Sequence, residues 1–101
     1  MVRHNVVPFE LSRPHAQELI HKLAAAGSFV MEPVFTEKLH VRDFTMRQAL
    51  TTMKEGTVNQ GPTRDEYGDL KCRVRKRVAG RLVRVVVAIH EGSLLYLISI
   101  H

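Results

Sequence analysis

The residues from Leu70 to Val78 alternate almost strictly between apolar and basic side chains. Successive side chains of a β-strand point to opposite faces, so this pattern predicts a strand with one apolar face and one basic face. The apolar set is Leu70, Cys72, Val74 and Val78, and the basic set is Lys71, Arg73, Arg75 and Arg77. Such a strand needs a second layer over its apolar face, which constrains the fold more than any other part of the chain.

Two further strands are predicted, over residues 81–90 and 93–101. Ala79-Gly80 and Glu91-Gly92 resemble two-residue turns, and the length of a turn sets the register of its hairpin. Counting from the first turn places Arg75 opposite Arg84. Counting from the second predicts three pairs, which are Arg84 with Ser99, Leu82 with His101 and Val83 with Ile100. It also puts Leu94, Tyr96, Ile98 and Ile100 in the core, and Leu95 and Leu97 on the basic face.

Two helices are predicted in the first two thirds of the chain. Ser12 is a good N-cap with Pro14 in the first turn, and the apolar spacing predicts a helix over 13–26, before Gly27. Thr45 and Gln48 form a capping box at the start of a second helix, which ends at Gly56.

The segments between these helices carry weaker signals. Residues 28–39 favour a short strand interrupted by Pro33, residues 57–60 another short strand, and residues 61–69 a loop. Residues 1–10 are predicted to be a loose N-terminal arm. The chain is therefore predicted to be a single α+β domain over residues 1–101. Two helices would pack on one face of a mainly antiparallel sheet of three or four strands.

The charge and the cysteine and histidine content of the chain indicate which kinds of ligand it can bind. The 101 residues carry a formal net charge of +5 and a sequence pI near 9.9, which points to nucleic acid or another polyanion. A single cysteine excludes an intrachain disulfide, and no signal peptide or membrane-spanning stretch is predicted, so we expect a cytoplasmic protein. The six histidines show no metal-ligand spacing, so no metal or other cofactor is predicted.

The basic face is the first candidate for a functional site. Like charges directly opposite each other destabilise a sheet, so the Arg75–Arg84 pair indicates a surface that receives a polyanion. The alternative is an ordinary solvated face. Because apolar residues such as Leu82, Val86 and Ala88 share this face, we expect it to be partly covered and to form a cleft.

Four segments resemble a family of small bacterial proteins related to the BrnT toxins and, more distantly, to RelE-like ribonucleases. They are Glu18-Leu19-Ile20, Arg42-Asp43-Phe44-Thr45 with the helix ending in Lys54-Glu55-Gly56, Gly80 with Arg84-Val85-Val86-Val87-Ala88, and Leu97-Ile98-Ser99-Ile100. Relatives carry a histidine and an arginine at helical spacing before the second segment. Here Val34 and Lys38 stand at those places, and the nearest histidine is His40.

The resemblance implies a metal-independent endoribonuclease of a toxin–antitoxin system, with RNA as substrate, ribosome dependence in some relatives, and an acidic antitoxin as partner. Such cleavage needs a base and an acid for proton transfer, and cations for the charge on the phosphate. The predicted catalytic residues are His101, then His40, with Arg84 and Arg75. The predicted RNA-binding residues are Arg42, Arg73, Lys71, Arg77 and Tyr67.

Two alternatives remain open on the same residues. A non-catalytic module would use the arginine face to hold RNA or DNA through phosphate contacts. A protein-docking module would place this face against an acidic partner. The sequence does not predict an oligomeric state.

Overall fold

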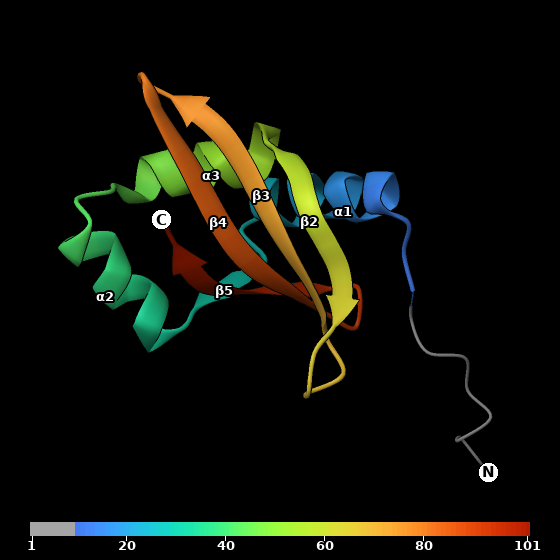
Figure 1. Cartoon of the computed structure of the whole chain (residues 1–101). Coiled ribbons are helices and arrows are strands. Elements are labelled where there is room, and N and C mark those ends of the chain that lie inside the picture. Colours follow the sequence, from blue (N-terminus) through green and yellow to red (C-terminus); the bar gives the residue numbers. More distant parts are fainter. Residues whose placement is uncertain (1–9) are drawn as a thin grey trace, which may run out of the picture.

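The computed structural model describes residues 10–101, which contain three helices and five strands (Figure 1). In chain order they are α1 (Arg13–Ala25), β1 (Phe29–Met31), α2 (Pro33–Val41), α3 (Met46–Glu55), β2 (Thr57–Arg64), β3 (Leu70–Val78), β4 (Arg81–His90) and β5 (Leu94–Ile100). All but the last residue of the predicted N-terminal arm lies outside the described residues. No helix within 10–101 is long and apolar enough to cross a membrane.

The strands form one sheet in the order β1-β5-β4-β3-β2. β1 runs parallel to β5, and the other neighbours are antiparallel. The predicted α+β class is confirmed. The predicted arrangement was incomplete, because the sheet is mixed and has five strands, and a third helix accompanies the two that were predicted.

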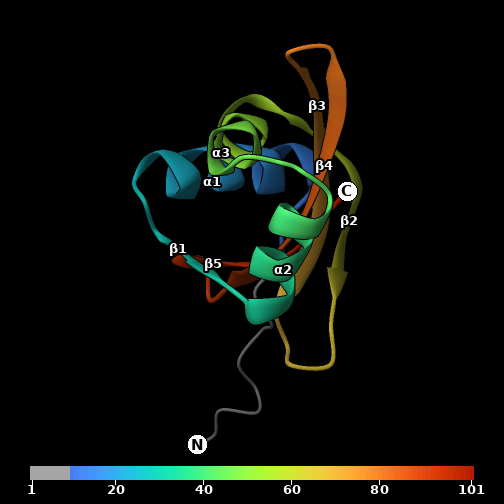
Figure 2. The ribbon, with the colours of Figure 1, turned by 90° about the vertical axis from the view of Figure 1, so that its left-hand side faces the viewer.

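Helices α1 and α3 lie on one side of the sheet, as the side view in Figure 2 shows. The core fills the space between them and the sheet, and its fully buried large side chains include Ile20, Met53, Val74, Val85, Leu97 and Ile100. Helix α2 packs beside β5 instead. We call the sheet face turned away from α1 and α3 the outer face; it faces the viewer in Figure 1.

The first hairpin has the predicted register. Ala79 and Gly80 both adopt positive φ angles, 51° and 82°, as a two-residue turn of the I′ type requires. Arg75 lies opposite Arg84, and Val74 lies opposite Val85 in the core. The alternation of the sequence therefore gives the correct faces for β3 and β4.

The register predicted for the second hairpin was wrong. The connection from His90 to Leu94 has three residues, and a bulge at Ile98 then shifts the pairing again. As a result Val86 lies opposite Ser99, and the backbone of Arg84 pairs with His101. The core takes Leu95, Leu97 and Ile100, while Leu94, Tyr96 and Ile98 are only partly buried. After the bulge, the side chains again point to the predicted faces, and for that reason Ile100 was correctly predicted to lie in the core.

The two predicted helices are confirmed with their caps. The side chain of Ser12 caps α1 by accepting from His15 N, and α1 ends one residue before the predicted end. The Thr45–Gln48 capping box is present at the start of α3, with both reciprocal hydrogen bonds formed.

Helix α2 was not predicted. The apolar and β-branched residues around Pro33 favoured a strand, but only Phe29–Met31 are extended. Pro33 occupies the first turn of α2, where its missing N–H costs nothing. Phe35 is fully buried and Leu39, one turn later, is partly buried, so this short helix is held mainly by packing.

Strand β2 is longer than predicted. It continues through Gly61-Pro62, which were assigned to a loop, and pairs with β3 as far as Arg64, with two register shifts. Proline is tolerated because β2 is an edge strand. The turn itself spans Asp65 to Asp69, where Asp65 Oδ1 accepts from Tyr67 N over 2.9 Å and from Asp69 N over 3.0 Å.

Candidate functional site: a cationic cluster on the outer face

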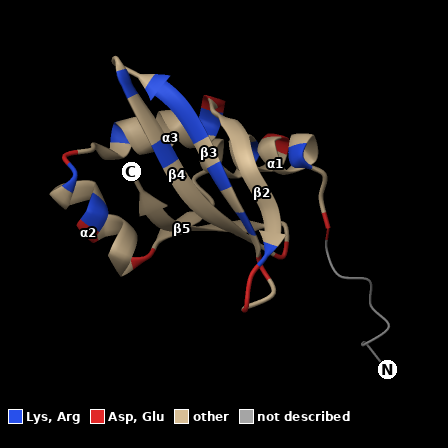
Figure 3. Ribbon diagram, in the orientation of Figure 1, with Lys and Arg blue, Asp and Glu red and all other residues tan. Residues whose placement is uncertain are grey.

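Basic residues gather on the outer face of β3 and β4. Figure 3 shows Lys and Arg along both strands, whereas Asp and Glu colour the loop between β2 and β3. Because β3 presents a basic side chain every second residue, the charges follow each other at about 7 Å along the strand. A row of this kind suits an extended polyanion better than a single small anion.

His101 is fixed beside this row by backbone pairing. Arg84 N donates to His101 O over 2.8 Å, and His101 N donates to Arg84 O over 2.9 Å. A pair that exchanges both hydrogen bonds places its two side chains on the same sheet face. The predicted catalytic residues His101 and Arg84 are therefore neighbours, although the register predicted for them was different.

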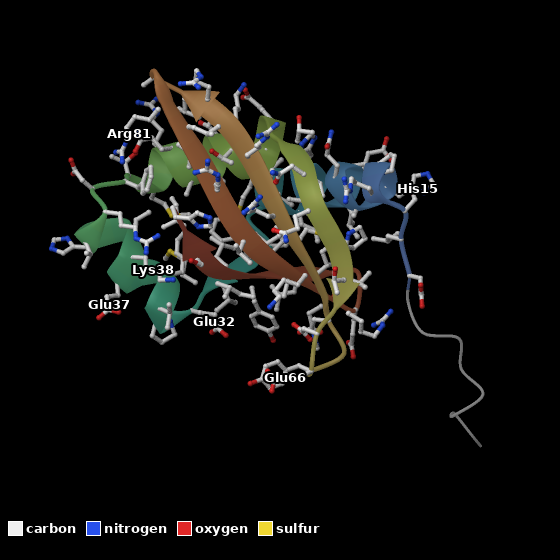
Figure 4. All side chains as sticks on the ribbon, viewed as in Figure 1. His15, Glu32, Glu37, Lys38, Glu66 and Arg81 are labelled. Carbon is white, nitrogen blue, oxygen red and sulfur yellow. The ribbon has the colours of Figure 1, made fainter. Side chains whose placement is uncertain are left out.

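Helix α2 adds two cations from the edge of the sheet. Lys38 Nζ donates to Ser99 Oγ over 3.1 Å, and an Arg42 guanidinium nitrogen donates to the carbonyl of Ile100 over 3.3 Å. Figure 4 shows Lys38 on the ribbon of α2. Lys38 lies in the last turn of α2 and Arg42 is its C-cap, and both side chains reach the end of β5.

Arg73 completes the group from β3. With the Asn59 amide oriented so that both of its groups are satisfied, Arg73 Nη2 donates to Asn59 Oδ1 over 3.1 Å and Asn59 Nδ2 donates to Arg73 O over 3.0 Å, which ties the guanidinium to β2. A cavity of about 400 Å³ lies beside it, lined by Gln60, Gly61, Thr63, Lys71, Cys72, Arg73 and Val86. We call His101 with Lys38, Arg42, Arg73 and Arg84 the cationic cluster.

The environment of His101 favours its neutral form. Burial lowers the pKa of His101 below its ordinary value, and the positive charges of Arg84, Arg73, Arg42 and Lys38 lower it further. Among the side chains of residues 10–101, the charged groups that shift this pKa are all cations. An imidazole held neutral among cations can accept a proton, while the cations can bind a phosphate group.

Three more of the predicted residues lie on the same face beside the cluster. Arg75 is exposed directly opposite Arg84, and Lys71 and Arg77 are exposed before and after it on β3. Arg77 donates to Gly80 O over 3.2 Å. Within residues 10–101, the side chains of Arg75, Arg84 and Lys71 form no hydrogen bond or ion pair, so these cations are available to a ligand.

The structure does not bring His40 to the cluster. Residues of a helix are rotated by about 100° each, so His40 points about 140° away from Phe35, the buried residue of α2. His40 is exposed, and it is absent from the charges that act on His101.

Tyr67 lies at the other end of the outer face, in the loop between β2 and β3, with 81% of its surface exposed. It therefore does not contact the cluster, although it remains available to a long ligand.

Lys38 is the member of the cluster that was not among the predicted site residues. Its signal was the spacing to Arg42, which places both cations on one side of a helix, but the segment was interpreted as a strand. Ser99, which accepts from Lys38, was placed on the correct face.

Comparison of the chain with known protein families, with curated proteins and with solved structures finds no match. The resemblance to BrnT and RelE-like toxins therefore stays a prediction. No group of three or more His, Cys, Asp or Glu side chains within residues 10–101 is arranged to hold a metal ion.

Proposed function

We propose that this protein binds single-stranded RNA through the phosphate backbone, along the outer face of its sheet. The observation that carries the proposal is the cationic cluster, in which four Lys and Arg side chains of the described residues gather around His101 and lower its pKa by their charge. Arginine pairs with phosphate through two parallel hydrogen bonds, and the guanidinium of Arg84 has no partner within the described chain.

The unpaired Arg75 and Arg84 support the same proposal. They lie directly opposite each other, a placement that costs stability in the free protein. A polyanion bound between them converts this repulsion into attraction. The open row of cations from Lys71 to Arg77 also favours a chain of phosphates over a single one.

Binding is tested by fluorescence anisotropy of a labelled short RNA at several salt concentrations. Each phosphate contact contributes about 0.7 to the slope of log K against log salt for a single strand. We therefore expect the double variant Arg75→Gln/Arg84→Gln to lower the slope by about 1.4. The matched control is Arg47→Gln, which removes an exposed arginine from α3 on the helical side of the sheet.

The outcome separates the proposal from its alternatives. An unchanged slope in the double variant would reject the outer face as the binding surface. Equal affinity for DNA of the same sequence would widen the ligand to single-stranded nucleic acid. No binding to RNA or DNA at physiological salt would favour an acidic protein as the partner.

A second candidate function is metal-independent cleavage of the bound RNA, as a toxin-like endoribonuclease. The observation that favours it is His101, which is held neutral beside the cations that would bind the phosphate. His101 would take the proton of the 2′-hydroxyl, and the 2′-oxygen would attack phosphorus. The 5′-oxygen would leave with a proton taken from solvent water, giving a 2′,3′-cyclic phosphate and a 5′-hydroxyl end.

Cleavage ranks second because the outward orientation of His40 leaves the cluster with a single histidine. The test is to map new RNA 5′ ends after adding the protein to a translation extract, and to free RNA in the presence of EDTA. Cuts that are lost in His101→Ala, but kept in His40→Ala, would establish a nuclease with His101 at its site. No cuts in either setting would leave RNA binding as the function.

A further inference from the structure

The outer face ends, opposite the cationic cluster, in a hollow of different chemistry. Two adjoining cavities of about 200 and 290 Å³ share four lining residues, Glu32, Tyr67, Asp69 and Tyr96. We call this hollow the tyrosine pocket. It is built from the start of α2, the loop between β2 and β3, and β5.

The walls of the pocket are suited to a flat ring. Tyr96 lies on β5 and contacts the ring of His90, with centroids 5.5 Å apart. Tyr67 lies on the loop across the hollow, and Ala88 and Ile98 supply an apolar floor. Planar bases of single-stranded RNA stack on aromatic side chains of this kind.

The pocket also contains a buried acceptor that the fold does not use fully. Only 10% of the Asp69 side chain is exposed, and its Oδ1 lies 2.7 Å from His90 Nδ1. Within residues 10–101, Oδ2 of Asp69 makes no hydrogen bond. A carboxylate is an acceptor only, so this oxygen fits a ligand that offers an N–H group.

Position links the pocket to the cationic cluster. Ala88 lies four residues after Arg84 on β4, which is about 13 Å along the strand. Lys71 lines the pocket, and Arg73, two residues later on the same face, belongs to the cluster. A short oligonucleotide therefore reaches from one to the other along a continuous surface.

We infer that the tyrosine pocket receives one base of the bound RNA and selects bases with an exocyclic amino group. The inference rests on the proposed RNA binding and adds base preference to it. The amino groups of cytosine and adenine donate to a carboxylate, as in base recognition by Asp and Glu. Uracil has a carbonyl oxygen where cytosine has the amino group, and its one N–H donor lies between two carbonyl oxygens, which the carboxylates of Asp69 and Glu32 repel.

The pattern of charge favours a nucleotide over a basic peptide. The anionic phosphate of a nucleotide matches the cationic cluster. Its base, which carries N–H donors, matches the acidic tyrosine pocket. A lysine or arginine side chain of a peptide matches the tyrosine pocket but not the cationic cluster, and the neighbouring cations Lys71 and Arg73 repel it.

The test compares the affinities for cytosine, adenine and uracil homo-oligomers at one salt concentration. We expect uracil to bind at least several-fold more weakly than the other two. Asp69→Asn should remove most of this difference. Glu32→Gln should reduce it, whereas Glu37→Gln is the matched control because Glu37 points away from the sheet (Figure 4).

Tyr67→Leu gives a second variant with little risk to the fold, because Tyr67 is largely exposed. Loss of one stacking contact should weaken all three oligomers by about tenfold. Equal binding of the three oligomers to the native protein, or unchanged affinity in Tyr67→Leu, would overturn the inference.

A titration without phosphate distinguishes the failure of the pocket from the failure of the proposed function. Cytidine and uridine are added to ¹⁵N-labelled protein, and the amide signals of Asp69 and Tyr96 are followed by NMR. Shifts with cytidine and not with uridine would support the pocket even if no oligomer binds. Shifts with N-acetyl-arginine amide alone would contradict it and identify a basic peptide as the ligand.

Discussion

Arg84 and His101 exchange both of their backbone hydrogen bonds, 2.8 and 2.9 Å long, at the end of the pairing between β4 and β5. The final histidine of the sequence is thereby held on the outer face, next to an arginine whose charge lowers its pKa. The candidate site depends on this pair, because the backbone connection places His101 where burial and the charges of the cationic cluster lower its pKa.

The first prediction concerns the pKa of His101. Replacing Arg84 by Gln removes the positive charge that lowers the pKa of His101 most, so this pKa should rise toward its ordinary value. The chemical shifts of the imidazole protons, followed against pH, measure this change. If Arg84→Gln left the titration of His101 unaltered, the cationic cluster would not be assembled around it.

The sign of that pKa shift also predicts the pH dependence of any cleavage. A general base acts in its deprotonated form, so the rate should rise with pH through the lowered pKa of His101 and then level off. Half of the maximal rate should be reached below pH 6.5, the ordinary pKa of histidine. In Arg84→Gln the profile should move to higher pH, and a rate that falls as pH rises across this range would exclude His101 as the base.

The second prediction is that replacing Arg75 stabilises the fold and weakens RNA binding. Like charges directly opposite each other weaken a sheet, so Arg75→Thr should raise the free energy of unfolding by about 0.2–1 kcal/mol while weakening RNA binding. Urea unfolding and anisotropy measure the two effects. Arg77→Thr is the control for the stability measurement, since Arg77 lies on the same strand but opposite Leu82 instead of an arginine. A loss of stability in Arg75→Thr, greater than that in the control, would contradict the prediction.

The third prediction concerns the Asp69–His90 pair. The hydrogen bond and charge of Asp69 raise the pKa of His90 above 6.5, with a smaller contribution from Glu91. A raised pKa means that the pair stabilises the fold fully at pH values below the ordinary pKa of His90, and that this contribution is lost as pH rises through the raised pKa. Asp69→Asn should remove the contribution and lower the His90 pKa, as measured by NMR titration and by unfolding at several pH values.

The fourth prediction tests the register of β5. Leu97 is fully buried, whereas Ile98 sits at the bulge and is only partly buried. Leu97→Ala should therefore cost about 2–5 kcal/mol of unfolding free energy, and Ile98→Ala distinctly less. Urea denaturation of both variants measures the two losses of unfolding free energy. A larger loss in Ile98→Ala than in Leu97→Ala would contradict the observed register and support the one that a two-residue turn implies.

The contrast between the two hairpins shows which parts of this fold follow from sequence. Ala79-Gly80 is an unambiguous two-residue turn, so the faces of β3 and the Arg75–Arg84 pair were predicted correctly. Glu91-Gly92 also adopts positive φ angles, but pairing resumes only after Ser93. One additional residue in a turn exchanges the faces of the following strand, and short-range sequence patterns do not reveal it.

Helix α2 shows the second limit. Its residues have strand-like side chains, and its stability comes from burying Phe35 against the sheet, which is a tertiary effect. Missing this helix hid Lys38 from the candidate site and left the orientation of His40 undetermined. The basic residues of β3 and β4, in contrast, needed only the two-residue period of a strand.

The most direct test of the account is an NMR map of the RNA-binding surface. A short single-stranded RNA is added to ¹⁵N-labelled protein, and the amide shifts are assigned along the chain. We predict that the largest changes fall on the outer face, at Arg73, Arg84 and His101, with few on α1 and α3. Changes confined to the helical side, or none at physiological salt, would contradict the claim that the cationic cluster is the functional site.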